Sequence, residues 1–164
     1  MKLKKFGLFV LVCALGAAFA QSPAPTAEQM VEQLKNPPRT RNLSIEPAPP
    51  SAKPSLSLQI QFDFDSARVS TESQHVLVNL AQALDAPALL NSRFAIEGHT
   101  DAKGAAGYNL KLSEARAAAV VAFLKGNGVD ASRLEASGKG SSEPANSAKP
   151  LAAENRRVRI VNLN

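Results

Sequence analysis

The chain has 164 residues, of which 45% are hydrophobic, and a formal net charge of +5. This length suits one modest domain with attached segments, and the apolar content is ordinary for a globular protein. Three of the excess positive charges, Lys2, Lys4 and Lys5, lie in the first twenty residues, which contain no acid, so +2 remains for the rest. A charge that small does not indicate a nucleic-acid-binding protein.

Residues 1–20 have the pattern of a secretory signal peptide. The basic start precedes an apolar run, residues 6–15, and Ala18-Phe19-Ala20 supplies a small-x-small cleavage pattern before Gln21. The apolar run is shorter than the roughly 20 residues that a membrane-spanning helix needs. We therefore expect cleavage, with an uncleaved anchor as the alternative.

Cys13, the only cysteine, lies inside this signal peptide. A lipoprotein signal would place a small residue directly before its lipidated cysteine, whereas Val12 stands there. We predict that Cys13 is removed with the signal, which leaves a mature chain without thiols or disulfides. A lipid anchor on Cys13 is the alternative.

Residues 21–55 form a predicted linker that contains eight of the eleven prolines. Such a composition favours extended polyproline segments and cannot bury a core. A short helix is predicted over residues 26–36, with Met30, Val31 and Leu34 on one side. It could dock on a partner. We favour a fraying helix within a tether, because isolated helices of this length are marginal.

The folded domain is predicted over residues 56–164. Its first strand is predicted from Leu56 to Phe64, where apolar and polar residues alternate strictly. A helix capped near Ser70 should then run to Leu84, ended by Asp85 and Pro87.

The second half of the domain contains three further strands and one more helix. A strand over residues 93–97 leads into a glycine-containing loop, and a helix follows from between Ala105 and Ser113 to about Asn127. Its buried face is predicted to carry Leu112, Ala119, Val120, Phe123 and Leu124. Strands are predicted over 133–136 and 156–161. This order, β-α-β-α-β-β, predicts an α/β two-layer sandwich with helices on one face of a mixed sheet.

The segment between the second strand and the second helix carries a recognisable motif. It comprises Gly98-His99-Thr100-Asp101, Gly104, Tyr108-Asn109, Leu112-Ser113 and Arg116-Ala117. Together with the blocks Phe62–Ser66 and Asn155–Val158, it resembles the OmpA-like peptidoglycan-binding domain found in OmpA C-termini, the lipoprotein Pal and the motor protein MotB. Three ordered blocks are stronger evidence than one short motif. The resemblance covers residues 56–163.

The resemblance implies that Asp101 and Arg116 hold meso-diaminopimelate in the stem peptide of peptidoglycan. The chemistry agrees, because a carboxylate accepts hydrogen bonds from an ammonium and a guanidinium grips a carboxylate through paired hydrogen bonds. The alternative is a structural ion pair between Asp101 and Arg116.

Further residues are implicated by the same resemblance. Asp65, Thr100, Asn109 and Leu112 are expected near the ligand, although a purely structural role is an open alternative for each. Asn155 and Arg156 are expected to support the pocket, with Arg156 bracing it, whereas Arg157 and Arg159 should form a solvated face. The family commonly has Gly-Arg shortly before this asparagine, but Leu151-Ala152 stands here, so the loop before the last strand should differ.

The sequence does not indicate an enzyme, a metal site or a cofactor. His99, Asp101 and Ser113 lack a nucleophile elbow, so we expect His99 to be a packed or hydrogen-bonded histidine. Two isolated histidines without a mature cysteine do not make a zinc site. Phosphate loops and dinucleotide fingerprints are absent from the sequence.

We therefore predict an exported, non-enzymatic protein of a Gram-negative envelope that binds peptidoglycan noncovalently. It would lie in the periplasm, free or associated with the outer membrane or the wall, and contribute to envelope integrity or anchoring. One alternative is a protein-interaction module of the same fold that uses the surface around Met30 and Leu34. The other is a hydrolase that acts on the wall.

Overall fold

The computed structural model describes residues 24–35, 53–63 and 66–164. The predicted signal peptide, most of the linker and the predicted ligand residue Asp65 lie outside the described residues. The elements are α1 (Ala27–Lys35), β1 (Ser55–Leu58), α2 (Thr71–Leu84), β2 (Phe94–His99), α3 (Ala106–Gly126), β3 (Leu134–Gly140) and β4 (Val158–Asn162), with 3-10 turns at Ala131–Arg133 and Ala153–Asn155.

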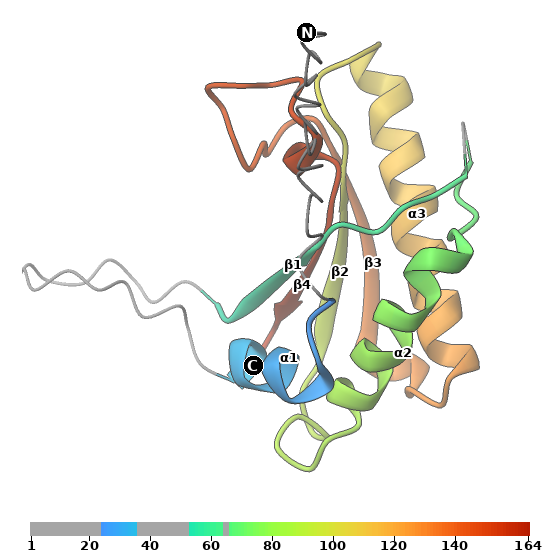
Figure 1. Ribbon diagram of the computed structural model, residues 1–164, viewed down its shortest axis with the longest axis vertical. Coiled ribbons are helices and arrows are strands. Elements are labelled where there is room, and N and C mark those ends of the chain that lie inside the picture. The colour runs from blue at the N-terminus through green and yellow to red at the C-terminus, as the bar shows by residue number, and fades with distance from the viewer. Residues whose placement is uncertain (1–23, 36–52, 64–65) are drawn as a thin grey trace, which may run out of the picture.

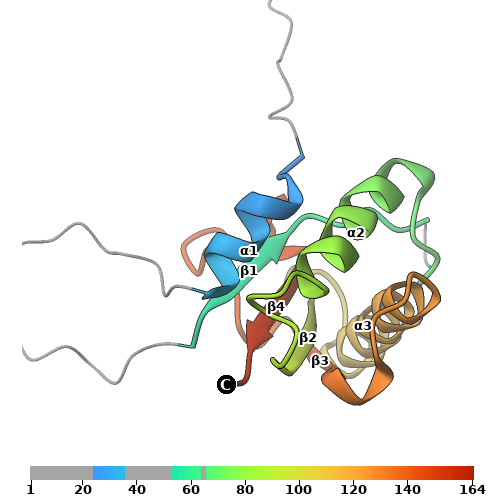
Figure 2. The same ribbon diagram turned by 90° about the horizontal axis from the view of Figure 1, so that it is seen from below.

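The four strands form one mixed sheet in the order β1-β4-β2-β3. Strand β4 pairs antiparallel with β1 and β2, whereas β2 and β3 are parallel and are connected through α3. Helices α2 and α3 lie side by side over one face of the sheet, with α1 next to α2 (Figure 1 and Figure 2). The predicted two-layer α/β arrangement with a mixed sheet is therefore confirmed.

The first strand is shorter than its alternating sequence predicted. The ladder with β4 ends at Leu58, although Ile60 is still buried and Phe62 half-buried. The amide of Gln61 donates to Ser73 Oγ at 2.9 Å, and its carbonyl accepts from the Ser70 amide at 3.0 Å. The backbone of Gln61 is thus satisfied by the start of α2 rather than by the sheet, so the prediction of a strand was wrong for residues 59–63.

Helix α1 packs on the domain, which contradicts its interpretation as a fraying helix in a tether. The side chains of Met30 and Leu34 are 0% exposed and belong to the hydrophobic core. Two side-chain amides fix the ends of the segment: Asn79 Nδ2 donates to the Pro25 carbonyl, and Asn162 Nδ2 donates to the Leu34 carbonyl, each at 3.2 Å. A nine-residue helix is stabilised here by packing rather than by its own propensity. The surface proposed for a partner around Met30 and Leu34 is consequently buried.

Helix α3 lies against two glycines of the sheet. A Cβ on Gly98 would lie 2.1 Å from the Ser113 carbonyl oxygen, and a Cβ on Gly138 would lie 2.6 Å from the Glu114 amide nitrogen. The Ser113 hydroxyl donates to the Leu110 carbonyl at 2.8 Å and accepts from the Gly140 amide at 2.9 Å. The glycines therefore allow an unusually close contact between helix and sheet.

This close contact turns a stripe of α3 inward that agrees only in part with the predicted one. The buried residues are Asn109, Ser113, Ala117, Val120 and Leu124. The predicted burial of Val120 and Leu124 is therefore confirmed, whereas Leu112, Ala119 and Phe123 lie at the edge of the buried face and are only half-buried. Small and polar residues occupy the first turns because the helix backbone approaches the glycines there.

Candidate functional site

Asp101 lies just after β2, with its side chain 14% exposed. One carboxylate oxygen, Oδ1, accepts from the Lys103 amide at 3.1 Å. The other, Oδ2, accepts from Arg156 Nη1 at 2.8 Å. The carboxylate is therefore oriented by one backbone donor and one charged side chain.

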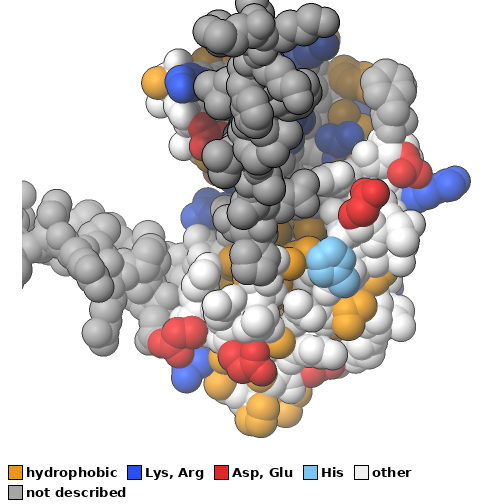
Figure 3. All heavy atoms as spheres, viewed as in Figure 1, with side chains coloured by type: hydrophobic (Ala, Val, Ile, Leu, Met, Phe, Trp, Pro, Cys, Tyr) orange, Lys and Arg blue, Asp and Glu red, His pale blue; other side chains and the backbone are white. Residues whose placement is uncertain are grey.

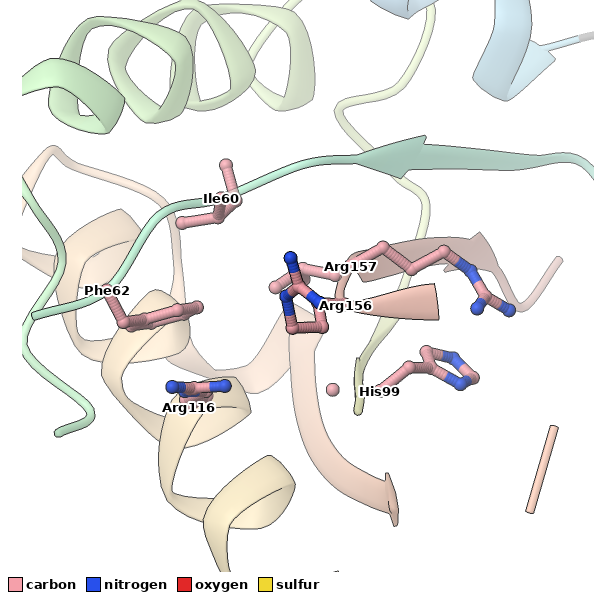
Figure 4. Close-up of a pocket in the computed structure, with 8 residues that line it drawn as sticks. Ile60, Phe62, His99, Arg116, Arg156 and Arg157 are labelled. Atoms are coloured by element: carbon pink, nitrogen blue, oxygen red, sulfur yellow. The ribbon is translucent and has the colours of Figure 1, made fainter. Parts of the chain in front are cut away.

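Arg116 lies three residues after Ser113 on α3, on a half-buried part of the helix. Its Nε donates to the Ser66 carbonyl at 3.3 Å, and its guanidinium lies 4.8 Å from the centre of the Phe62 ring. Figure 4 shows the guanidinium beneath this ring. A cation–π contact and a backbone acceptor thus restrict the orientation of the Arg116 guanidinium.

Asp101 and Arg116 line one open cleft of about 500 Å³. The same cleft includes the other predicted ligand residues that the structure describes, together with the predicted supporting arginine: Thr100, Asn109, Leu112 and Arg156. Lys and Arg side chains are visible toward the end of the molecule where β2 ends (Figure 3). The arrangement offers a carboxylate and two guanidiniums to one ligand.

Asn109 and Thr100 hold the loop that carries Asp101. Asn109 is buried, and its Nδ2 donates to the carbonyls of Asp101 at 3.3 Å and Lys103 at 3.0 Å. The Thr100 amide donates to the Gly140 carbonyl at 2.9 Å. The side-chain amide nitrogen of Asn109 thus donates to the loop backbone, which gives this residue a positioning role.

Asn155 fixes the loop before β4. It is 0% exposed; its Oδ1 accepts from the Asn146 amide at 2.9 Å, and its Nδ2 donates to the carbonyls of Lys149 at 2.9 Å and Pro150 at 3.0 Å. The Pro150 carbonyl also accepts from the Ala102 amide, next to Asp101. The buried side-chain amide of Asn155 therefore holds the loop before β4 next to the Asp101 loop. It also positions the backbone from which the Arg156 side chain extends.

Arg156 and Arg157 point to opposite sides of the chain (Figure 4). Arg156 turns toward Arg116 and Phe62, whereas Arg157 lies beside His99. The prediction that Arg157 and Arg159 form a solvated face was wrong for Arg157, because the Nη1 atom of Arg157 is buried. Burial is the main cause that lowers the pKa of Arg157, and the positive charge of Arg159 lowers it further. Arg159 is two-thirds buried and pairs with Glu97 at 3.6 Å.

His99 is a buried histidine on the sheet face turned away from α3. Burial and the neighbouring Arg157 lower its pKa to about 4, and within the described residues neither ring nitrogen has a hydrogen-bond partner. Glu97, Lys139 and Glu143 complete the charged surroundings, and Glu97 raises the pKa of Lys139. Since the Ser113 hydroxyl is engaged between α3 and β3, His99 and Ser113 do not form a nucleophile–base pair.

Phe62, Ser66 and Lys103 contribute to the site but were not predicted as site residues. Phe62 stood in a recognised block, but its place in the alternating pattern indicated only a core position. Its contact with Arg116 joins segments 54 residues apart in the sequence, which no local pattern reports.

Two further properties concern only the part of the chain that the structure describes. Residues 24–35, 53–63 and 66–164 hold no cluster of three or more His, Cys, Asp or Glu side chains arranged to bind a metal ion. Within the same ranges, every helix is too short or too polar to span a bilayer.

Comparison with known proteins identifies a family and relatives of this chain. Residues 61–158 match the OmpA family. Outer membrane protein A of Bordetella avium is 39% identical over 117 residues, which are 70% of this chain and 59% of the relative, so the chain spans about three fifths of that protein. The outer-membrane lipoprotein YfiB of Pseudomonas aeruginosa is 34% identical over 162 residues, 98% of this chain and 92% of the relative.

A solved structure has the same fold. The peptidoglycan-associated lipoprotein of Burkholderia pseudomallei is 34% identical with a TM-score of 0.54, and the match covers 65% of this chain and 88% of that one.

Proposed function

Because the chain belongs to the OmpA family, we propose that it binds peptidoglycan noncovalently and anchors an envelope component to the wall. The observation that carries this proposal is the single cleft that Asp101 and Arg116 share. A ligand that bears an ammonium and a carboxylate can pair with both side chains at once. The name of the Burkholderia relative, a peptidoglycan-associated lipoprotein, supports the same ligand.

We infer that the ligand group is the meso-diaminopimelate of the stem peptide. Its ammonium would donate to Asp101, and its carboxylate would accept from the Arg116 guanidinium. Phe62 and the Ser66 carbonyl restrict that guanidinium before the ligand arrives, so less conformational freedom is lost on binding. The bidentate geometry that a guanidinium provides is not available to lysine.

The other predicted site residues have supporting parts in this proposal. Thr100 and Leu112 form part of the cleft wall, while Asn109 and Asn155 hold its two loops. Asp65 is proposed as a further ligand residue on the strength of the family resemblance alone.

The proposed setting is the periplasm of a Gram-negative cell. Residues 1–20 would direct export, and residues 56–164 would form the wall-binding domain. Helix α1, which packs on that domain, belongs to the same folded unit. The names of the Bordetella and Pseudomonas relatives, an outer membrane protein and an outer-membrane lipoprotein, support an envelope location.

A sacculus pull-down tests the proposal. The wild type, Arg116→Ala and Asp101→Asn are incubated with sacculi of the diaminopimelate type, and the bound fraction is measured. We expect retention of the wild type and loss of both variants. Arg93→Ala is the control, because Arg93 is an exposed arginine paired with Glu135 outside the cleft. Equal retention of all four proteins contradicts the proposal.

The same preparation distinguishes a binding protein from a hydrolase. Binding predicts retention without release of soluble muropeptides over hours. Release that depends on added protein would favour the hydrolase alternative.

A further inference from the structure

The Asp101 carboxylate already has a cationic partner within the protein. Arg156 Nη1 lies 2.8 Å from Oδ2, and the Lys103 amide occupies Oδ1. With the Asp101 side chain 14% exposed, little of this carboxylate remains accessible. An ammonium that approaches Oδ2 therefore meets the position taken by the Arg156 guanidinium.

Arg156 is fixed at its backbone and loosely held at its tip. Its amide donates to the Ala153 carbonyl at 3.0 Å, and it follows the fully buried Asn155. Its side chain is 50% exposed. Within the described part of the chain, its guanidinium has hydrogen bonds and ion pairs only with Asp101. A ligand can therefore displace the guanidinium without disturbing the fold.

Displacement has an electrostatic consequence. The cleft also contains Arg116 and Lys103, so a released Arg156 guanidinium would face two like charges. This repulsion is offset only where the ligand supplies an anion, because charge-assisted hydrogen bonds to a carboxylate replace the lost ion pair. The binding of an ammonium at Asp101 and of a carboxylate near Arg156 should thus be coupled.

We propose that Arg156 is a specificity-determining residue that occupies the ammonium position on Asp101 and yields it only to a ligand bringing its own carboxylate. This inference rests on the proposed function and deepens it. The side chain of meso-diaminopimelate in a stem peptide carries an ammonium and a carboxylate at one carbon. The ammonium can therefore take the place of Arg156 on Asp101 while the carboxylate pairs with the displaced guanidinium. The side chain of L-lysine in a stem peptide ends in an ammonium without a carboxylate on the same carbon, and it leaves the displaced guanidinium unpaired.

Calorimetric titration with two soluble muropeptides tests the exchange. Disaccharide tripeptides with meso-diaminopimelate or L-lysine are titrated into the wild type, Arg156→Ala and Arg156→Lys. We expect the wild type to prefer the diaminopimelate peptide. In Arg156→Ala, the ratio of the two affinities should fall at least tenfold, mainly through tighter binding of the lysine peptide. Arg156→Lys should be intermediate, since it keeps the charge but loses the fork.

Arg157→Ala is the matched control. It removes the same charge from the neighbouring residue, whose side chain points away from the cleft (Figure 4), and should leave the affinity ratio unchanged. Thermal unfolding of each variant checks that the fold persists.

The possible failures are distinguishable. An unchanged ratio in Arg156→Ala, or an equal loss of affinity for both peptides, overturns the specificity role and leaves wall binding intact. Binding of neither peptide by the wild type overturns the proposed function, and this inference with it.

Discussion

Gly98→Ala tests whether the close contact between α3 and the sheet positions the site. The added Cβ would lie 2.1 Å from the Ser113 carbonyl oxygen, with the Ser113 carbonyl carbon at 2.9 Å. Ordinary contacts of carbon are about 3.5 Å, so the helix must move on the order of 1 Å. Because the obstructing atoms are backbone, no rotamer change relieves the clash. Overpacking of this kind costs about 1–3 kcal/mol.

The same displacement should weaken binding. Arg116 lies one helical turn beyond Ser113, and a functional site tolerates shifts of only about 0.5 Å. We expect the affinity for a diaminopimelate muropeptide to fall about tenfold or more, alongside the loss of stability in urea unfolding.

Gly126→Ala is the control for this prediction, because a Cβ there would meet nothing within 4 Å. It should leave affinity unchanged and stability equal or slightly higher, by up to about 1 kcal/mol. If Gly98→Ala retained wild-type stability and affinity, the argument that the glycines position α3 would be refuted.

Three further predictions concern stability. Leu34→Ala should lower the free energy of unfolding by about 2–5 kcal/mol in urea titrations and expose α1 to proteases. Gln33→Ala, on the exposed side of α1, should have little effect, and equal effects of the two substitutions would contradict the packing of α1 on the domain. Since the pKa of His99 is about 4 in the folded chain and near 6.5 when unfolded, the unfolded state binds more protons between these values. The free energy of unfolding should therefore fall as the pH drops from 6.5 to 4, and His99→Gln should flatten this dependence. The same pH dependence in the wild type and in His99→Gln would show that His99 does not cause it. Asn155→Ala leaves buried carbonyls unpaired and should cost about 1–3 kcal/mol while weakening muropeptide binding, and unaltered binding would show that this loop does not position Arg156.

The strands and helices of the domain could be predicted because their patterns are local. Alternation located β1, and the periodicity from Ser70 to Leu84 located α2. The end of β1 could not be found in this way, because alternation reports burial on one side and not the hydrogen-bond ladder. Ile60 remains buried after the backbone has turned to α2.

The errors at α1 and α3 have a different origin. Propensity describes an isolated helix, whereas Met30 and Leu34 are buried against segments distant in sequence. On α3, the inward stripe depends on glycines in β2 and β3, which a helical pattern does not contain. Hydrophobic periodicity therefore selected Leu112 and Phe123 where the contact with the sheet selects Ser113 and Ala117.

The site was predicted as a set of residues but not as a set of contacts. The motif indicated Asp101 and Arg116 as site residues, and both line one cleft. The ion pair of Asp101 with Arg156 joins residues 55 apart, and the Phe62 ring against Arg116 depends on the turn after β1. Both contacts arise from tertiary packing, which the sequence blocks do not specify.

The crystal structure of the complex with a meso-diaminopimelate muropeptide is the most direct measurement of the central claim. We predict the ligand ammonium within hydrogen-bond distance of the Asp101 carboxylate and its carboxylate on the Arg116 guanidinium. A muropeptide bound elsewhere on the molecule, with the cleft between these two side chains empty, would contradict the account.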